Sequence, residues 1–63
     1  MIVKAFSLRR GDTIIRNARF EGGFIIGNPD NSGGMIEVTV RTPSGVEVVY
    51  YDFSEDVEIA YRG

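Results

Sequence analysis

The sequence contains no cysteine and no histidine. Without cysteine the chain cannot form a disulfide, and without either residue the usual ligands for zinc and haem are missing. The absence of histidine also removes the commonest base for activating a serine or threonine nucleophile. We therefore expect no metal, no cofactor and no enzymatic activity.

Carboxylates are the remaining candidates for chemistry. Asp52, Glu55 and Asp56 cluster around an expected helical turn, which indicates capping and solvation rather than acid–base catalysis. The loop 27–34 carries one carboxylate, Asp30, whereas a calcium loop requires several at alternate positions. Neither pattern predicts a catalytic or metal site.

The chain also lacks a long apolar run. No stretch approaches the roughly 20 apolar residues of a membrane-spanning helix. The start, Met1 to Phe6, lacks the apolar core of a signal peptide. We expect no membrane segment and a cytoplasmic location.

The 63 residues are enough for one domain, residues 1–63. A domain of this size buries only about 60% of the surface that its unfolded chain exposes. Small folds without disulfides or metals often gain stability by oligomerising. A homo-oligomer is therefore one expectation.

The net charge is −2, and the charges are unevenly distributed along the chain. The first part is basic and the last part is acidic. Two interpretations stay open: the two parts neutralise each other in the folded chain, or they lie on different faces. The residues concerned are Lys4, Arg9, Arg10, Arg16 and Arg19 at the front, and Glu47, Asp52, Glu55, Asp56 and Glu58 at the back.

Residues 35–53 have the pattern of a β-hairpin. Pro43 and Gly45 favour a three-residue loop with a glycine bulge, which sets Thr42 opposite Val46. A two-residue loop would mix apolar and charged residues on one face, so the bulged register is preferred. The predicted pairs are Arg41 with Glu47, Val40 with Val48, Thr39 with Val49, Val38 with Tyr50, Glu37 with Tyr51 and Met35 with Phe53.

This register predicts which hairpin residues form the core. The core face carries Ile36, Val38, Val40, Val46, Val48 and Tyr50. The opposite face is also apolar, and two explanations stay open: the strand bends and is buried on both sides, or the face contacts a protein partner or a second copy. The residues predicted for that contact are Met35, Val49, Tyr51 and Phe53.

The rest of the chain reads as short β-segments. We expect a strand over 2–7, a strand entrance at 13–15, a buried strand at 24–26 and a closing strand over 57–62. Residues 27–34 read as a loop, and residues 54–56 as a single helical turn capped by Ser54. The prediction is an all-β domain: a small, strongly bent, five-stranded barrel with one short helical turn before the last strand.

This order resembles the Src-homology-3-like (SH3-like) small barrel, in particular its Tudor and KOW types. The residues that carry the resemblance are Arg10-Gly11-Asp12-Thr13-Ile14-Ile15, Phe20-Glu21-Gly22-Gly23-Phe24-Ile25-Ile26, and Ser54-Glu55-Asp56 before Val57-Glu58-Ile59. The resemblance implies a binding module for nucleic acid, peptides or proteins.

Two functions remain. The first is a non-enzymatic protein-interaction or assembly module that uses the apolar hairpin face. The alternative is a nucleic-acid-binding barrel, in which arginines contact phosphates and Phe20 and Phe24 stack on bases; both aromatics could instead belong to the core. The arginines predicted for this alternative are Arg9, Arg10, Arg16 and Arg19.

Overall fold

Seven antiparallel strands make up most of the described chain, residues 1–17 and 20–62 of a computed structural model. A single turn of 3-10 helix, η1 (Ala5–Ser7), follows the first strand. The all-β class is therefore confirmed. The strands are β1 (Ile2–Lys4), β2 (Thr13–Asn17), β3 (Phe20–Ile25), β4 (Asp30–Ser32), β5 (Met35–Thr42), β6 (Gly45–Asp52) and β7 (Asp56–Glu58).

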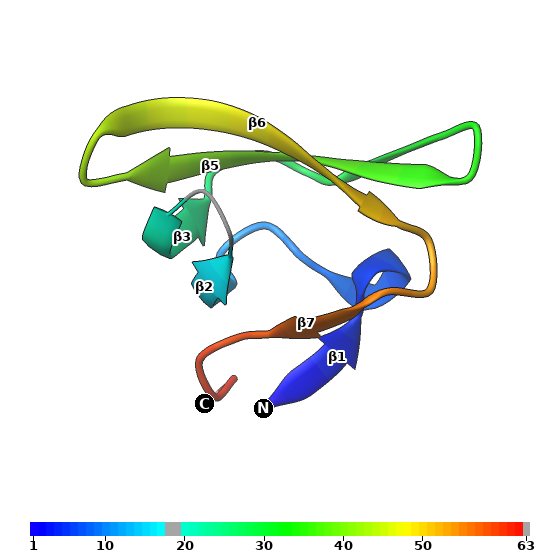
Figure 1. The fold of residues 1–63 in the computed structure, drawn as a ribbon, viewed down its shortest axis with the longest axis horizontal. Coiled ribbons are helices and arrows are strands. Elements are labelled where there is room, and N and C mark those ends of the chain that lie inside the picture. Colours follow the sequence, from blue (N-terminus) through cyan, green and yellow to red (C-terminus); the bar gives the residue numbers. More distant parts are fainter. Residues whose placement is uncertain (18–19, 63) are drawn as a thin grey trace.

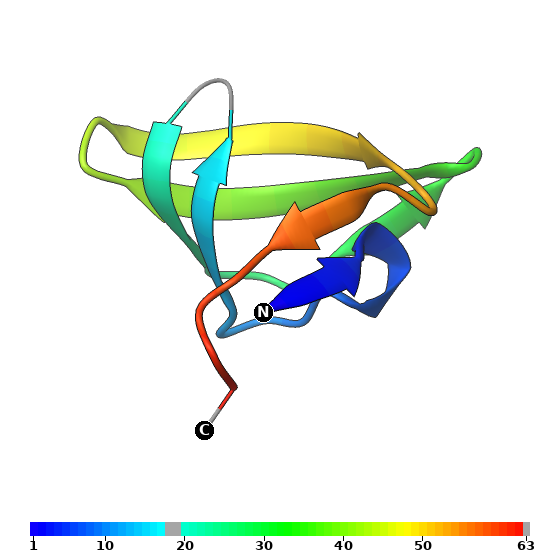
Figure 2. The same ribbon diagram turned by 60° about the horizontal axis from the view of Figure 1, so that its bottom comes forward.

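The strands form two sheets. The larger has the order β2-β3-β5-β4, with β6 paired to β5, and the smaller pairs β1 with β7. The long β5–β6 hairpin lies on one side of the molecule, and the β1–β7 pair lies on the other (Figure 1). Turning the view shows β2 and β3 running across the hairpin (Figure 2). A bridge between Ile14 and Ile59 links the two sheets, but the sheets do not close into a barrel.

The predicted loop 27–34 contains the short strand β4, which pairs with the beginning of β5. The predicted helical turn before the last strand is wrong. Residues Asp52 to Glu55 instead form a tight turn, in which the Glu55 N–H donates to the Asp52 carbonyl at 3.0 Å. The Glu55 carboxylate accepts a hydrogen bond from the Asp52 N–H at 3.1 Å. Because this side chain already caps the turn, β7 begins at Asp56 without a helix.

The core lies between the β5–β6 hairpin and the strands that cross it. Gly23 shows how tightly it is packed. A Cβ atom at this position would lie 2.5 Å from Cε1 of Phe20, so the buried ring of Phe20 occupies the space of the missing side chain. The side chains with almost no exposure come from three strands and the bridge segment: Ile14, Ile25, Val38, Val40 and Ile59.

The hairpin register differs from the prediction by one residue. Thr42 pairs with Gly45 across a two-residue loop, so Val40 lies opposite Glu47. The Thr42 hydroxyl decides the turn: it accepts from the Ser44 N–H at 3.1 Å and donates to the Gly45 carbonyl at 3.0 Å. Gly45 takes a φ of 125°, which a residue with a side chain rarely adopts. The predicted bulged register is therefore wrong.

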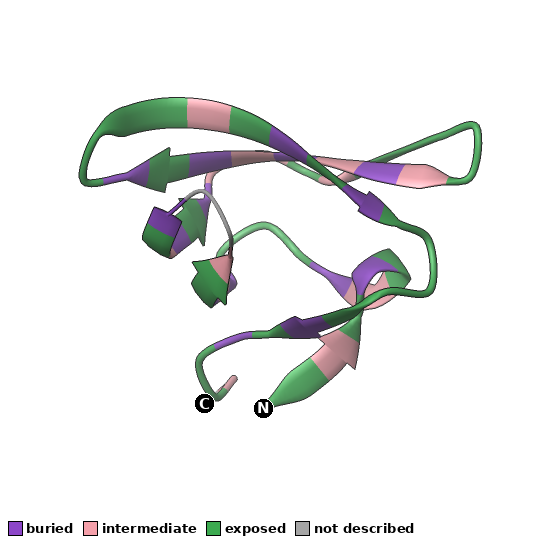
Figure 3. Ribbon diagram, in the orientation of Figure 1, coloured by how far each residue is buried: buried purple, intermediate pink, exposed green. Residues whose placement is uncertain are grey.

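A shift of one residue exchanges the two faces of β6. Val49 and Tyr51 are only 3% and 6% exposed, whereas Val46 and Tyr50 are 61% and 56% exposed. Buried and exposed segments alternate along this part of β6 in Figure 3. The β6 residues predicted for the core thus point outward, and Val49 and Tyr51, predicted for contacts, pack inward. On β5 the prediction is confirmed, because Ile36, Val38 and Val40 are buried.

The C-terminal segment is tied to the loop before β2 by a partly buried ion pair. Both oxygens of the Asp12 carboxylate accept from the Arg62 guanidinium, at 2.9 and 2.6 Å. The same carboxylate accepts from the Arg9 N–H, and Arg62 also donates to the Ser7 carbonyl. These hydrogen bonds, led by the one from Arg62, hold the pKa of Asp12 below its ordinary value of 3.8 even though burial acts in the opposite direction.

Candidate binding surfaces

The four residues predicted for protein contact do not form one surface. Val49 and Tyr51 are buried, because the true register turns them into the core. The Tyr51 hydroxyl accepts from the Asn17 amide at 2.9 Å, and burial raises the pKa of Tyr51. Met35 is half-buried at the start of β5, and Phe53 is exposed after the end of β6. The contact surface predicted from Val49 and Tyr51 is therefore a part of the core.

Phe53 belongs to a different exposed pair. Its ring stacks on that of Phe6 with a centroid distance of 4.8 Å and an interplanar angle of 24°. The backbone joins the same segments, since the Phe6 N–H donates to the Phe53 carbonyl at 3.0 Å. The two rings cover each other, so this pair is explained by the contact between η1 and the end of β6.

A different apolar surface lies on the outside of the β3–β5–β6 sheet. Directly opposed residues in an antiparallel sheet point to the same face. Phe24 is paired with Arg41, and Arg41 with Val46, while Val48 and Tyr50 follow along β6. We call this surface the outer face and define it by its four exposed apolar side chains: Phe24, Val46, Val48 and Tyr50.

Tyr50 is fixed on the outer face by its neighbour across the ladder. Its hydroxyl donates to the Glu37 carboxylate at 2.8 Å. This hydrogen bond, together with the charge of Glu37, raises the pKa of Tyr50, so the phenol is neutral at physiological pH. The ring is therefore held as a rigid, uncharged anchor on the surface.

The outer edge of β6 has no pairing strand among residues 1–17 and 20–62. In the part of the chain that the structure describes, β6 pairs only with β5. The Thr39 carbonyl accepts from the Ile26 N–H on the side away from β6. In an antiparallel ladder, the two residues of a non-hydrogen-bonded pair direct their backbone N–H and carbonyl groups away from each other, and such pairs recur at every second residue. Thr39 and its partner Val48 form a pair of this kind. The backbone groups of Val46, Val48 and Tyr50 therefore point away from β5.

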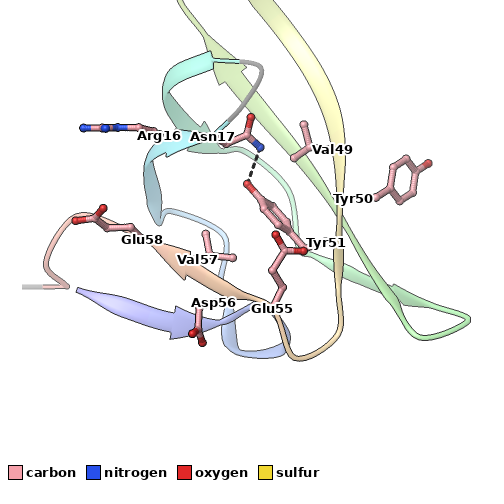
Figure 4. Close-up of a pocket in the computed structure, with 9 residues that line it drawn as sticks. All are labelled: Arg16, Asn17, Val49, Tyr50, Tyr51, Glu55, Asp56, Val57 and Glu58. Carbon is pink, nitrogen blue, oxygen red and sulfur yellow. Dashed lines mark hydrogen bonds between the residues drawn. The ribbon is translucent and has the colours of Figure 1, made fainter.

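A cleft of about 440 Å³ lies next to this edge. One wall is β6, and the opposite wall comes from β2 and β7. Figure 4 shows the Tyr51 side chain reaching toward Asn17, with Tyr50 pointing away from the cleft. Of the residues that the structure describes, three carboxylates and one guanidinium line the walls: Glu55, Asp56, Glu58 and Arg16.

A second cleft of about 450 Å³ lies at the other end of the sheet. Arg10 and Arg41 line it together with Phe24, whose ring is 46% exposed. Gly11 and the backbone of Ile25 form its base, joined by a hydrogen bond from the Gly11 N–H to the Ile25 carbonyl. The cleft thus places two cations around an exposed aromatic ring.

The arginines predicted for nucleic-acid binding do not lie together. Arg10 lines the second cleft, whereas Arg16 lines the first. Arg9 is exposed, and its N–H donates to Asp12. Arg19 lies outside the described residues. Of the two aromatics considered for stacking, Phe20 is buried and Phe24 is exposed.

A comparison of the chain with protein-family models, with curated proteins and with solved structures found no match. Among the described residues, no cluster of three or more acidic, histidine or cysteine side chains could hold a metal ion. The described part of the chain also contains no helix with the length and apolar character needed to cross a membrane. The case for a function therefore depends on the surfaces themselves.

Sequence reasoning missed the outer face and Arg41. The signal that could have revealed them is the tetrapeptide Thr42-Pro43-Ser44-Gly45. A threonine before Pro-Ser can cap a two-residue turn with its hydroxyl, as Thr42 does here. The two-residue register follows from that turn and places Val46, Val48 and Tyr50 on the surface.

Proposed function

We propose that the protein is a non-enzymatic interaction module that binds a protein partner through the outer face. The observation that carries this proposal is the set of four exposed apolar side chains, two of them aromatic, on strands β3 and β6, which flank β5. Contiguous apolar patches on small domains commonly mark interaction sites. The predicted protein-binding role thus moves from Val49 and Tyr51 to the opposite face of the same hairpin.

The outer face has the properties of a good contact surface. Its residues lie on a hydrogen-bonded sheet, and Tyr50 is held by Glu37, so little conformational freedom would be lost on binding. Aromatic side chains with a polar tip are common anchors at interfaces because they bury a large area and still form a hydrogen bond. Arg41, beside Phe24, would add a charged contact at one end.

We further propose that the fold is an open form of the SH3-like small barrel. It is supported by the short antiparallel strands and by the β2–β3 hairpin that runs across the β5–β6 hairpin (Figure 2). The opening between β6 and β2 would then be an unclosed seam of such a barrel. Small barrels of this kind generally serve as binding modules, which agrees with a role in recognition.

A photo-crosslinking residue tests the outer face directly. Placed at position 48, it is expected to yield one discrete protein adduct in cells that express the chain, whereas the same residue at Asp30, on β4, should yield none. Tyr50→Ser should weaken the adduct about tenfold or more, because a truncated aromatic anchor commonly costs over 1 kcal/mol of binding. Mass spectrometry of the adduct identifies its protein.

The controls separate binding from folding. Tyr50→Ser should keep the far-UV circular dichroism and the melting temperature of the parent, since the side chain is exposed. An adduct formed with a second copy would indicate assembly. The proposed function would be contradicted if the parent with the photo-crosslinking residue at position 48 formed no protein adduct. It would also be contradicted if Tyr50→Ser left the adduct unchanged.

Single-stranded nucleic acid is a second candidate ligand, favoured by the Arg10–Phe24–Arg41 cleft. An exposed ring between two guanidinium groups can stack on a base while the cations contact phosphates. The double change Arg10→Ala and Arg41→Ala should reduce the affinity for a labelled oligonucleotide about tenfold at low salt. It should also reduce the slope of log affinity against log salt by about 1.4, at ~0.7 for each lost contact.

Arg16→Ala is the matched control for this candidate. It removes the same charge from the other cleft, so it should leave oligonucleotide affinity unchanged. Fluorescence anisotropy measures both variants. The nucleic-acid candidate is excluded if the parent does not bind the oligonucleotide at about 50 mM salt. It is also excluded if Arg16→Ala lowers the affinity as much as the double change at Arg10 and Arg41 does.

A further inference from the structure

The edge of β6 has the features of a site for strand addition. Its outward N–H and carbonyl groups belong to Val46, Val48 and Tyr50, and no described strand pairs with them. Natural proteins usually protect a long edge strand with lysine, proline or a bulge. Between Gly45 and Asp52 the chain has none of these, and the pairing with β5 is continuous.

We propose that an extended, basic segment of a partner protein adds to this edge as a further antiparallel or parallel strand. The inference rests on the proposed function, and it names the chemistry of the partner and how it binds. Strand addition obtains affinity from main-chain hydrogen bonds and specificity from alternate side chains. The side chains of the added strand would lie alternately beside the outer face and in the cleft between β6 and β7.

The structure sets the length of the site. At Asp52 both outward groups are already satisfied, because the N–H donates to the Glu55 carboxylate and the carbonyl accepts from the Glu55 N–H. The edge is therefore available from residue 46 to residue 50. The cleft beside it, about 440 Å³ in volume, borders β6 at residues 49 to 51 and gives room for inward-pointing side chains.

The charges around the cleft favour a basic segment. Among the described residues, the cleft is lined by three carboxylates, those of Glu55, Asp56 and Glu58, and by one guanidinium, that of Arg16. Lys4 neutralises one of them, since its ammonium lies 2.7 Å from the Asp56 carboxylate. Lysine or arginine side chains that enter the cleft would meet the remaining acidic groups, and electrostatic complementarity of this kind selects partners and speeds association.

The same charges disfavour a second copy as the added strand. Antiparallel pairing of β6 with β6 would bring Glu47 of the second chain, which lies on the same face as Val49 and Tyr51, toward the acidic cleft. The segment from Gly45 to Asp52 itself contains no basic residue. Like charges brought together at an interface lower affinity. A basic partner segment fits where a second β6 does not.

Amide hydrogen exchange in the presence of a synthetic peptide tests this inference. The probe alternates valine with lysine or arginine, and its control carries glutamate at the basic positions. The basic peptide should slow the exchange of the Val46, Val48 and Tyr50 amides about tenfold or more, because they gain hydrogen-bond partners. The Glu47 and Val49 amides, which face β5, should change little. The acidic peptide should have no effect.

Two variants separate the backbone contribution from the charge contribution. Val48→Pro removes one outward N–H and no bond to β5, so the chain should fold and bind the peptide about tenfold more weakly. Val48→Thr keeps that N–H and changes only the side chain on the outer face, so it should lose much less affinity than Val48→Pro. Glu58→Gln should weaken binding several-fold at low salt, an effect that about 0.5 M salt should remove. Asp30→Asn is the charge control on β4.

Several results would overturn this inference. The first is that Val48→Pro binds the basic peptide as tightly as the parent does. The second is that the acidic peptide binds as tightly as the basic one. The third is that an oligonucleotide protects the same amides from exchange. Protection of these amides in the free chain, together with a dimer in sedimentation, would assign the edge to a second copy instead. If the peptide gives no protection while position 48 still cross-links to a protein in a Tyr50-dependent way, strand addition fails and the proposed function stands.

Discussion

Replacing Tyr51 with alanine is expected to bring the domain close to unfolding. Tyr51 is 6% exposed and packs in the core, so truncation removes a large buried ring and leaves a cavity. Aromatic-to-alanine changes in a core cost about 3–5 kcal/mol. A domain of 63 residues has a total stability of only about 3–9 kcal/mol at the usual value per residue. Urea unfolding of the purified variant measures the loss.

Tyr50 is the matched control, because it is the neighbouring tyrosine on the opposite face. Tyr50→Ala should change the free energy of unfolding by less than about 0.5 kcal/mol, as is usual for exposed positions. Tyr51→Phe keeps the ring and loses the hydrogen bond from Asn17, so about 1 kcal/mol is expected. Equal effects of the two alanine variants would contradict the hairpin register described above.

Removal of Arg62 is expected to have the second largest effect. Arg62→Ala leaves the buried Asp12 carboxylate without its bidentate partner, and loss of one member of a buried pair is costly. Because the guanidinium is partly exposed, we expect about 2–4 kcal/mol, somewhat less than the roughly 3–5 kcal/mol lost when one partner of a fully buried pair is removed. Arg62→Lys keeps the charge but not the two parallel hydrogen bonds, so it should restore only part of the stability. Thermal unfolding compares the three proteins.

The same pair predicts an acid dependence of stability. The pKa of Asp12 is lower in the folded chain than its ordinary value of 3.8. Below that ordinary value the unfolded chain binds a proton that the folded chain does not, so stability falls as the pH drops toward the folded pKa. The contribution is fully present above the unfolded pKa. In Asp12→Asn this part of the acid slope should disappear; an unchanged slope would show that other carboxylates cause it.

The sequence predicted the kind of fold better than its details. The alternation of Ile36 and the valines that follow it, together with Pro43 and Gly45, predicted the long hairpin, and β5 and β6 confirm it. The strand β4 was missed because the segment from 27 to 34 is rich in turn-forming residues. Asp30 to Ser32 form a strand there only because the beginning of β5 offers an edge to pair with.

The candidate surface shows the limit of pattern reading most clearly. Both faces of β6 are apolar, so hydrophobic alternation alone gave no preference between Val48-Tyr50 and Val49-Tyr51 as core residues. The choice depended on the turn, and the predicted glycine bulge selected the wrong face. The Thr42 hydroxyl bonds and the packing of Tyr51 against other strands decide it.

By itself, the sequence determined the all-β class, the position of the hairpin and the absence of histidine and cysteine chemistry, because these follow from local periodicity and composition. Tertiary structure alone decided which apolar face is exposed, which arginines share a cleft, and that Asp12 meets Arg62 across 50 residues. The physical reason is that these features depend on a one-residue register and on contacts between distant segments, which local patterns do not encode. The outer face and the edge of β6 are products of that register.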